Sequence, residues 1–165
     1  MFSFLRDIVF SRKIILSISY LLGIVFLVSG ITKSFGIQNF SDEIAQYMDY
    51  YLNIPSIIIY RKTLAISICL LELFIGILSF IKTRNMSLSV VTTLLLLIFV
   101  YFTGRNYCFA SEGYGIASCG CFGDLITLSP KWSFVKSSFL LSVSSFKLLM
   151  CCYINKQLHK DCNVL

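Results

Sequence analysis

The sequence predicts an all-α integral membrane protein, a four-helix bundle in a single domain that covers residues 1–165. Hydrophobic residues make up 57% of the chain and charged residues 13%, whereas a soluble protein carries roughly 25% charged residues. The apolar residues also gather into four long runs, each flanked by basic residues. A water-soluble fold of this length could not bury so much apolar surface, but a lipid bilayer would surround it.

Each of the four apolar runs holds about 18 to 23 residues, close to the roughly 20 that a helix needs to cross the hydrocarbon core. The predicted spans are residues 14–32, 63–81, 86–103 and 132–154. A cleaved signal peptide is the alternative for the first run, although its apolar stretch is longer than a usual signal core. The four spans place both termini on the same side of the membrane.

The formal net charge of +6 does not come from a basic patch, because lysines and arginines stand singly or in pairs at the ends of the apolar runs. This is the pattern of membrane-flanking charge and not of a nucleic-acid-binding stripe. Basic residues outnumber acidic ones in the amino-terminal segment, the turn near residue 83 and the tail. The positive-inside rule therefore predicts cytoplasmic termini and two outer loops, residues 33–62 and 104–131.

The first outer loop carries a helical pattern of apolar residues. Phe40, Ile44, Met48 and Tyr51 recur at helical spacing between polar residues in the stretch 39–53,. We expect a short amphipathic interfacial helix that lies on the outer surface of the membrane. A packed loop is the alternative.

The chain has seven cysteines, and three of them fall in the second outer loop: Cys108, Cys119 and Cys121. An outer compartment is oxidising, so thiols there can form disulfides. The other four lie in the predicted spans or the tail, where a buried cysteine behaves as a small apolar residue: Cys69, Cys151, Cys152 and Cys162.

Cys119 and Cys121 are separated by a single glycine. A disulfide over so small a ring requires a tight backbone turn, and Gly120 permits the dihedral angles of such a turn. A strained bridge is more oxidising and more easily reduced than a structural one. Cys119 and Cys121 are therefore the candidate catalytic pair for electron transfer, with Cys108 as an accessory or resolving thiol.

Two other arrangements of these thiols stay open. Cys108 could pair with Cys119 or Cys121 and staple the loop, which would leave one thiol over. A metal site would have only three sulfur ligands, because the single histidine, His159, lies in the tail. Three sulfurs make a poor closed zinc site, so no metal is predicted.

Glu72 lies at the middle of the second predicted span. An ionisable residue inside the bilayer is costly and is a functional candidate by default. The fourth span supplies two cations, Lys136 and Lys147, and either ammonium group would reach Glu72 if the two helices were neighbours. Alternatively, both lysines extend to the nearer membrane surface, and Glu72 is a protonated carboxyl group that forms hydrogen bonds within the bundle.

The chain resembles the MauE/DoxX group of redox-associated bacterial membrane proteins, and more closely its MauE branch. The residues that carry the resemblance are Gly30-Ile31-Thr32-Lys33, Glu72 with Gly76, and Cys119-Gly120-Cys121-Phe122-Gly123 before Trp132. The resemblance implies a four-helix domain of the bacterial inner membrane that supports disulfide formation or maturation of exported proteins. In the methylamine pathway this client is the cysteine-rich small subunit of methylamine dehydrogenase. Cys108 is not part of the family pattern.

These observations predict a thiol–disulfide oxidoreductase in the membrane. Its partner would be an exported cysteine-containing protein or a periplasmic thioredoxin-like protein, and nothing indicates nucleic acid. No cofactor is evident; electrons would pass to a second thiol pair or to a membrane quinone, for which the sequence identifies no pocket. Two other classes stay open. One is a non-catalytic membrane assembly or chaperone subunit with a structural disulfide, and the other is a small-molecule transporter built around Glu72.

Overall fold

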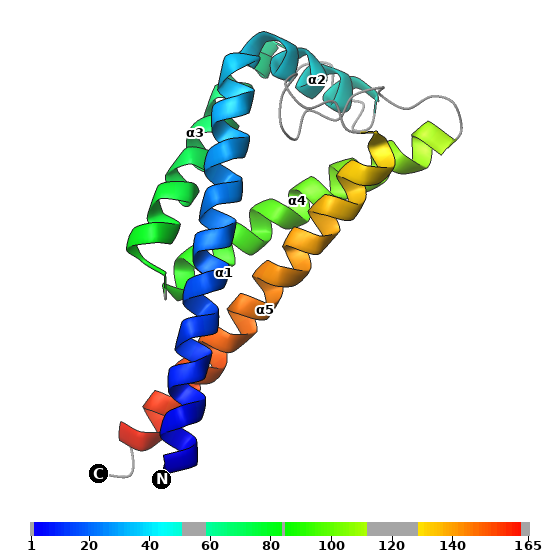
Figure 1. Ribbon diagram of the computed structural model, residues 1–165. Helices are drawn as coiled ribbons and strands as arrows, with labels where there is room; N and C mark the ends of the chain where they lie inside the picture. Colours follow the sequence, from blue (N-terminus) through cyan, green and yellow to red (C-terminus); the bar gives the residue numbers. More distant parts are fainter. Residues whose placement is uncertain (1, 51–58, 84, 112–128, 163–165) are drawn as a thin grey trace.

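The computed structural model describes residues 2–50, 59–83, 85–111 and 129–162, and these ranges form five α-helices (Figure 1). The helices are α1 Phe2–Phe35, α2 Ile37–Tyr50, α3 Arg61–Ile81, α4 Met86–Ser111 and α5 Pro130–Cys162. Four of them contain a segment long and apolar enough to cross a membrane: Lys13–Phe35, Arg61–Ile81, Met86–Cys108 and Pro130–Lys156. The predicted all-α fold with four spans is confirmed.

Helices α1 and α3 form a closely packed antiparallel pair. At Gly30 a Cβ atom would lie 2.9 Å from the Leu73 side chain, and at Gly76 it would lie 2.7 Å from Leu27. Glycine at these two positions therefore allows the backbones to approach. Small residues have this role in membranes because packing, and not exclusion of water, drives helices together there.

Helices α4 and α5 form the second pair. The Thr93 and Ser144 hydroxyls lie 2.9 Å apart across this interface, and the rings of Tyr107 and Phe134 stack with centroids 5.8 Å apart. The two pairs diverge toward the end of the molecule that carries α2 (Figure 1), which we call the loop end. One buried hydrophobic cluster joins all four spans: Leu22, Phe26, Ile75, Leu88, Leu96 and Leu140.

The predicted amphipathic helix is confirmed as α2, at the loop end of the bundle (Figure 1). Its apolar residues Phe40 and Ile44 are buried and pack with Ala65 and Cys69 of α3. An ion pair of 2.8 Å between Asp42 and Arg61 also joins α2 to the first turn of α3. The apolar face of α2 is thus directed at least partly toward α3, whose small side chains provide the space for it.

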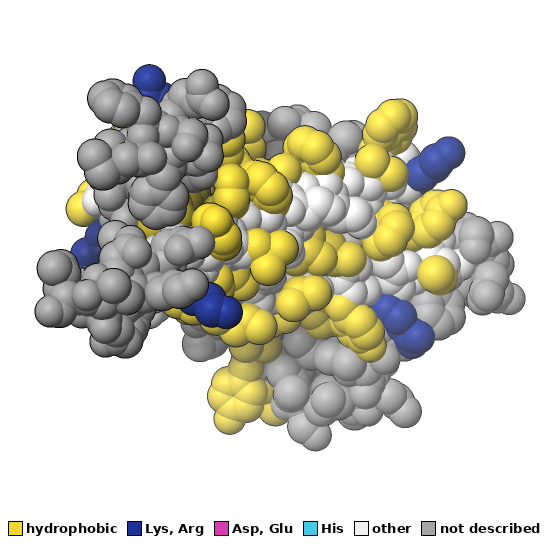
Figure 2. Space-filling model, turned by 90° about the horizontal axis from the view of Figure 1, so that it is seen from below, with side chains coloured by type: hydrophobic (Ala, Val, Ile, Leu, Met, Phe, Trp, Pro, Cys, Tyr) yellow, Lys and Arg dark blue, Asp and Glu magenta, His cyan; other side chains and the backbone are white. Residues whose placement is uncertain are grey.

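The outer surface of the bundle is apolar, as expected for contact with lipid. In Figure 2 hydrophobic side chains cover much of the visible described surface, and the Lys and Arg side chains lie apart from one another. Several small polar residues instead face inward, and their hydroxyls bond to the preceding turn of their own helix. Ser19 donates to the Ile15 carbonyl at 2.7 Å and Thr92 donates to the Leu88 carbonyl at 2.7 Å. These bonds within the helix satisfy the Ser19 and Thr92 hydroxyls without water.

Candidate functional site at the loop end

The predicted catalytic pair, Cys119 and Cys121, lies outside the described residues, but both ends of the segment that carries it are described. The segment leaves α4 and enters α5 at the loop end (Figure 1). Near these ends the Tyr107 and Phe134 rings are almost parallel, with an angle of 2° between their planes. The Phe134 ring also lies over Gly104. Cys108, the residue after Tyr107 in the sequence, is exposed.

A buried ion pair lies at the same end of the bundle. The Lys33 ammonium group from α1 contacts Oε1 of Glu72 from α3. Lys33 is 2% exposed and Glu72 is 0% exposed, so the protein and not solvent surrounds both charges. The second carboxylate oxygen, Oε2 of Glu72, is buried and has no hydrogen-bond partner among the described residues.

Two aromatic rings complete the surroundings of the Lys33 ammonium group. Its nitrogen lies 5.0 Å from the ring centre of Phe40 on α2 and 4.6 Å from that of Phe99 on α4. Cation–π contacts of this kind are strongest where water is excluded. The four residues come from four different helices, so a single cation joins α1, α2, α3 and α4.

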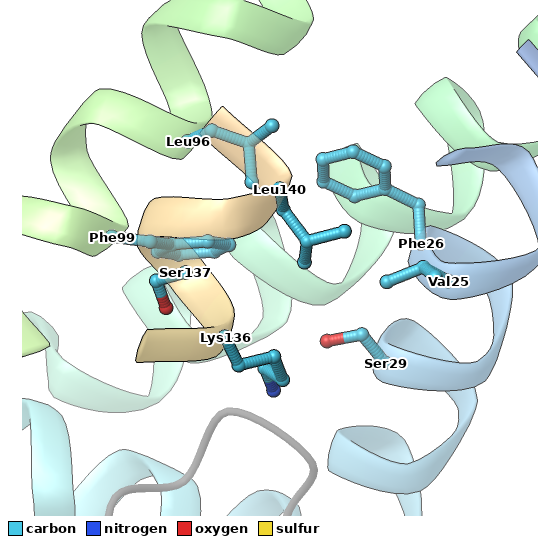
Figure 3. A pocket seen from close by; sticks show the side chains of 8 residues that line it. All are labelled: Val25, Phe26, Ser29, Leu96, Phe99, Lys136, Ser137 and Leu140. Carbon is cyan, nitrogen blue, oxygen red and sulfur yellow. The ribbon is translucent and has the colours of Figure 1, made fainter. Parts of the chain in front are cut away.

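Next to the ion pair, a hollow lies between α1 on one side and the α4–α5 pair on the other (Figure 3). Its volume is about 20 Å³, roughly the space that one water molecule needs. Phe99 lines it, so this ring contacts both the hollow and Lys33. The lining residues are Val25, Phe26, Ser29, Leu96, Phe99, Lys136, Ser137 and Leu140.

The family model described as methylamine utilisation protein MauE matches residues 11–150. The chain belongs to the MauE family. No curated protein and no solved structure matches it. The range matched by the MauE model includes the buried pair, the hollow and the Cys119-Gly120-Cys121 segment, so the resemblance seen in the sequence is confirmed at the level of the family.

In this MauE-family chain the ion pair expected between Glu72 and Lys136 or Lys147 is formed by Lys33 instead. The reason is the helix order, because α3 packs along α1 and has little contact with α5. Lys136 lines the hollow. Lys147 is 1% exposed, so it is buried in the bundle and does not extend to the membrane surface.

Lys33 is the functional candidate that the sequence reasoning missed. A basic residue at the end of an apolar run is typical of the membrane boundary, and Lys33 occupies such a position. The overlooked signal is helical phase. Ser19, Phe26 and Lys33 follow one another at intervals of seven residues and all are buried, so Lys33 continues the inward face of α1.

Proposed function

We propose that this MauE-family chain is a membrane-embedded thiol–disulfide exchange protein with Cys119 and Cys121 as its reactive pair. The observation that carries the proposal is the Cys119-Gly120-Cys121 sequence in the segment between α4 and α5. Two thiols one residue apart close a ring that encloses almost no chain, so a bridge between them would stabilise the fold very little. Such a bridge suits electron transfer better than it suits structural support.

The described ends of the segment support this role. The stacked rings of Tyr107 and Phe134 hold the end of α4 beside the start of α5, which restricts where the segment between them can reach. Cys108 is exposed one residue after Tyr107. A third thiol attached to the base of the reactive segment is suited to resolve a mixed disulfide, so Cys108 is the accessory thiol of the proposal.

The exchange reaction is balanced in electrons and atoms. A thiolate of a reduced partner attacks one sulfur of the Cys119–Cys121 disulfide, which forms a mixed disulfide and releases the other sulfur as a thiolate. The second thiolate of the partner then attacks the mixed bond. The partner has lost two electrons and leaves with a disulfide, while Cys119 and Cys121 have gained the two electrons and become thiols.

The charge pattern supports a location for this chemistry outside the bacterial inner membrane. With both termini cytoplasmic, the loop end faces the periplasm, where exported proteins acquire their disulfides. The family description names methylamine utilisation, and the family resemblance implies maturation of the cysteine-rich small subunit of methylamine dehydrogenase. The partner class is therefore an exported cysteine-containing protein, or a periplasmic thioredoxin-like protein that acts on it.

The test replaces each thiol separately with serine. Cys119→Ser and Cys121→Ser should leave the protein in the membrane at parental levels, because the bridge contributes little stability. Oxidation of the exported partner, measured by alkylation of its free thiols, should be lost in both variants. One of the two should accumulate a mixed disulfide with the partner. Cys108→Ser should reduce oxidation less, unless Cys108 is the resolving thiol.

Cys152→Ser is the matched control, because Cys152 is a half-buried cysteine near the opposite end of α5. It should oxidise the partner as the parent does. If Cys119→Ser or Cys121→Ser disappears from the membrane, the pair is a structural staple and the chain is an assembly subunit. If both variants persist and the partner is fully oxidised, the exchange function is refuted.

A further inference from the structure

Helix α2 lies across the loop end of the bundle and is joined to α1 through a single residue, Gly36. In Figure 1 it runs from the end of α1 toward the α4–α5 pair. The ring of Tyr47 on α2 contacts the ring of Phe102 on α4 edge to face, with centroids 5.5 Å apart. A glycine between two helices is a suitable hinge, so α2 can change its direction while α1 stays in place.

Beneath α2 lie the buried ion pair and a buried thiol. Phe40 packs with Cys69, which is 3% exposed, and its ring centre lies 5.0 Å from the Lys33 nitrogen. Glu72 follows Cys69 by about one helical turn, and its Oε2 atom has no hydrogen-bond partner among the described residues. A buried oxygen without a partner costs free energy. Water that entered beneath a displaced α2 would remove this cost, which therefore opposes the position of α2 in the structure.

The apolar face of α2 does not by itself favour this position, which we call the docked position. Phe40 and Ile44 leave water when they pack on α3, but they would also leave water if α2 lay on the membrane surface with these side chains in the lipid. Lipid is about as apolar as the surface of a helix, so the hydrophobic effect hardly distinguishes the two positions. The choice between them depends on contacts that lipid does not replace.

The contacts of this kind differ in strength. The Asp42–Arg61 ion pair contributes little, because its side chains are 43% and 37% exposed and water weakens their attraction. The edge-to-face contact of Tyr47 adds modestly to its apolar burial. The contact of Phe40 with the Lys33 ammonium group is buried, and cation–π attraction is strongest in such surroundings. Among these three contacts, the one with Lys33 is the strongest attachment of α2.

We propose that α2 is a hinged cover with two positions, docked on α3 or lying on the membrane surface, and that the Lys33 ammonium group holds it in the docked position. The docked helix keeps water and solutes away from Glu72 and Cys69. The released helix opens the loop end above both residues, and its apolar face then lies in the lipid. This proposal concerns access to the interior of the bundle and does not depend on the thiol–disulfide exchange.

The Cys69 thiol reports the position of α2, because α2 covers it. The full chain is reconstituted in nanodiscs of phosphatidylcholine and treated with N-ethylmaleimide, and mass spectrometry follows the alkylation of Cys69. The internal reference is Cys151, which is buried with Ile15 and Ile154 far from α2. Where opening and closing are fast, the alkylation rate of a covered thiol follows the population of the open form.

Phe40→Leu keeps an apolar side chain on α2 but removes the ring that faces Lys33. It should raise the alkylation rate of Cys69 by roughly two- to thirtyfold, the range that corresponds to one cation–π contact, and should leave the rate of Cys151 unchanged. Phe99→Leu is the matched control, because it removes a ring from the same ammonium group but on α4. It should change the rate of Cys69 much less.

The charge of the lipid tests the second position of α2. The helix carries Asp42, Glu43 and Asp49 and has no basic residue in its sequence, so an anionic membrane surface should repel it. With phosphatidylglycerol in place of phosphatidylcholine, the ratio of the Cys69 rate to the Cys151 rate should fall by roughly fivefold or more, the factor for one charge near such a surface.

Several outcomes would overturn the proposal. If Phe40→Leu has no effect, or only the effect of Phe99→Leu, the contact with Lys33 does not hold α2. A parallel rise of both cysteine rates would show that the whole bundle unfolds. Ile44→Val leaves a small gap beside Cys69 without removing a ring, and an equal rise in this variant would indicate a local gap and not a moving helix. A rate that does not depend on lipid charge would exclude the position on the membrane surface.

Discussion

Removal of one partner of the buried Lys33–Glu72 pair should destabilise the bundle strongly. In Lys33→Met the carboxylate of Glu72 would lie at 0% exposure without its cation. Loss of one member of a buried pair costs about 3–5 kcal/mol, because the other charge stays buried and uncompensated. The contacts of the ammonium group with Phe40 and Phe99 would be lost as well, at about 0.5–2 kcal/mol each, so we expect the upper part of this range.

The assay is thermal unfolding of the purified protein in detergent, followed by the fluorescence of Trp132. For a chain of this length, a loss of 3–5 kcal/mol corresponds to a decrease of the midpoint by roughly 6–20 °C. Glu72→Leu should show a decrease of similar size. Glu72→Gln should show a smaller one, because its amide oxygen can still accept a hydrogen bond from Lys33.

The double variant Lys33→Met/Glu72→Leu is the decisive measurement. It leaves no buried charge, so it should be more stable than either single variant, as is found when a whole buried pair is replaced by apolar residues. Since the double variant should lose less than either single variant, the coupling between the two substitutions should be larger than the larger single loss, about 3–5 kcal/mol or more. If the two losses of stability instead add up in the double variant, Lys33 and Glu72 do not interact.

Two further predictions concern orientation and packing. A membrane-impermeant thiol reagent applied to reduced intact cells should label Cys119 or Cys121 and should not label Cys162; labelling of Cys162 alone would invert the topology. Gly76→Leu should destabilise the α1–α3 pair by about 1–3 kcal/mol, because even a Cβ atom added at this glycine would lie 2.7 Å from the Leu27 side chain. Membrane levels and thermal midpoints at the parental value would show that the two helices do not pack closely at this position.

The four spans could be predicted because each is a continuous apolar run with basic flanks, a signal that depends on local sequence alone. Helix α2 could be predicted for the same reason, since Phe40 and Ile44 follow the helical period. The direction of its apolar face could not, because the choice between lipid and α3 depends on the small residues Ala65 and Cys69 of a helix that comes later in the chain.

The partner of Glu72 could not be read from the sequence for a related reason. Its position inside a span correctly marks Glu72 as buried, but the choice of cation depends on which helices are neighbours. The lysines of the fourth span were plausible partners only if that helix packed against the second. In the structure α3 packs along α1, and so Lys33, whose position resembles an ordinary membrane flank, contacts the carboxylate.

The buried pair has a structural consequence for how this bundle finds a single arrangement. Apolar helices in lipid have little preference for one register, since lipid is as apolar as the side chains. A slip of α1 along α3 by one turn, about 5.4 Å, would separate Lys33 from Glu72. It would also place larger residues than Gly30 and Gly76 against the Leu73 and Leu27 side chains, where the helices are too close for a Cβ atom. Both effects oppose the slip. Because Lys33 also contacts Phe99, the same register fixes α4 against α1 beside the hollow.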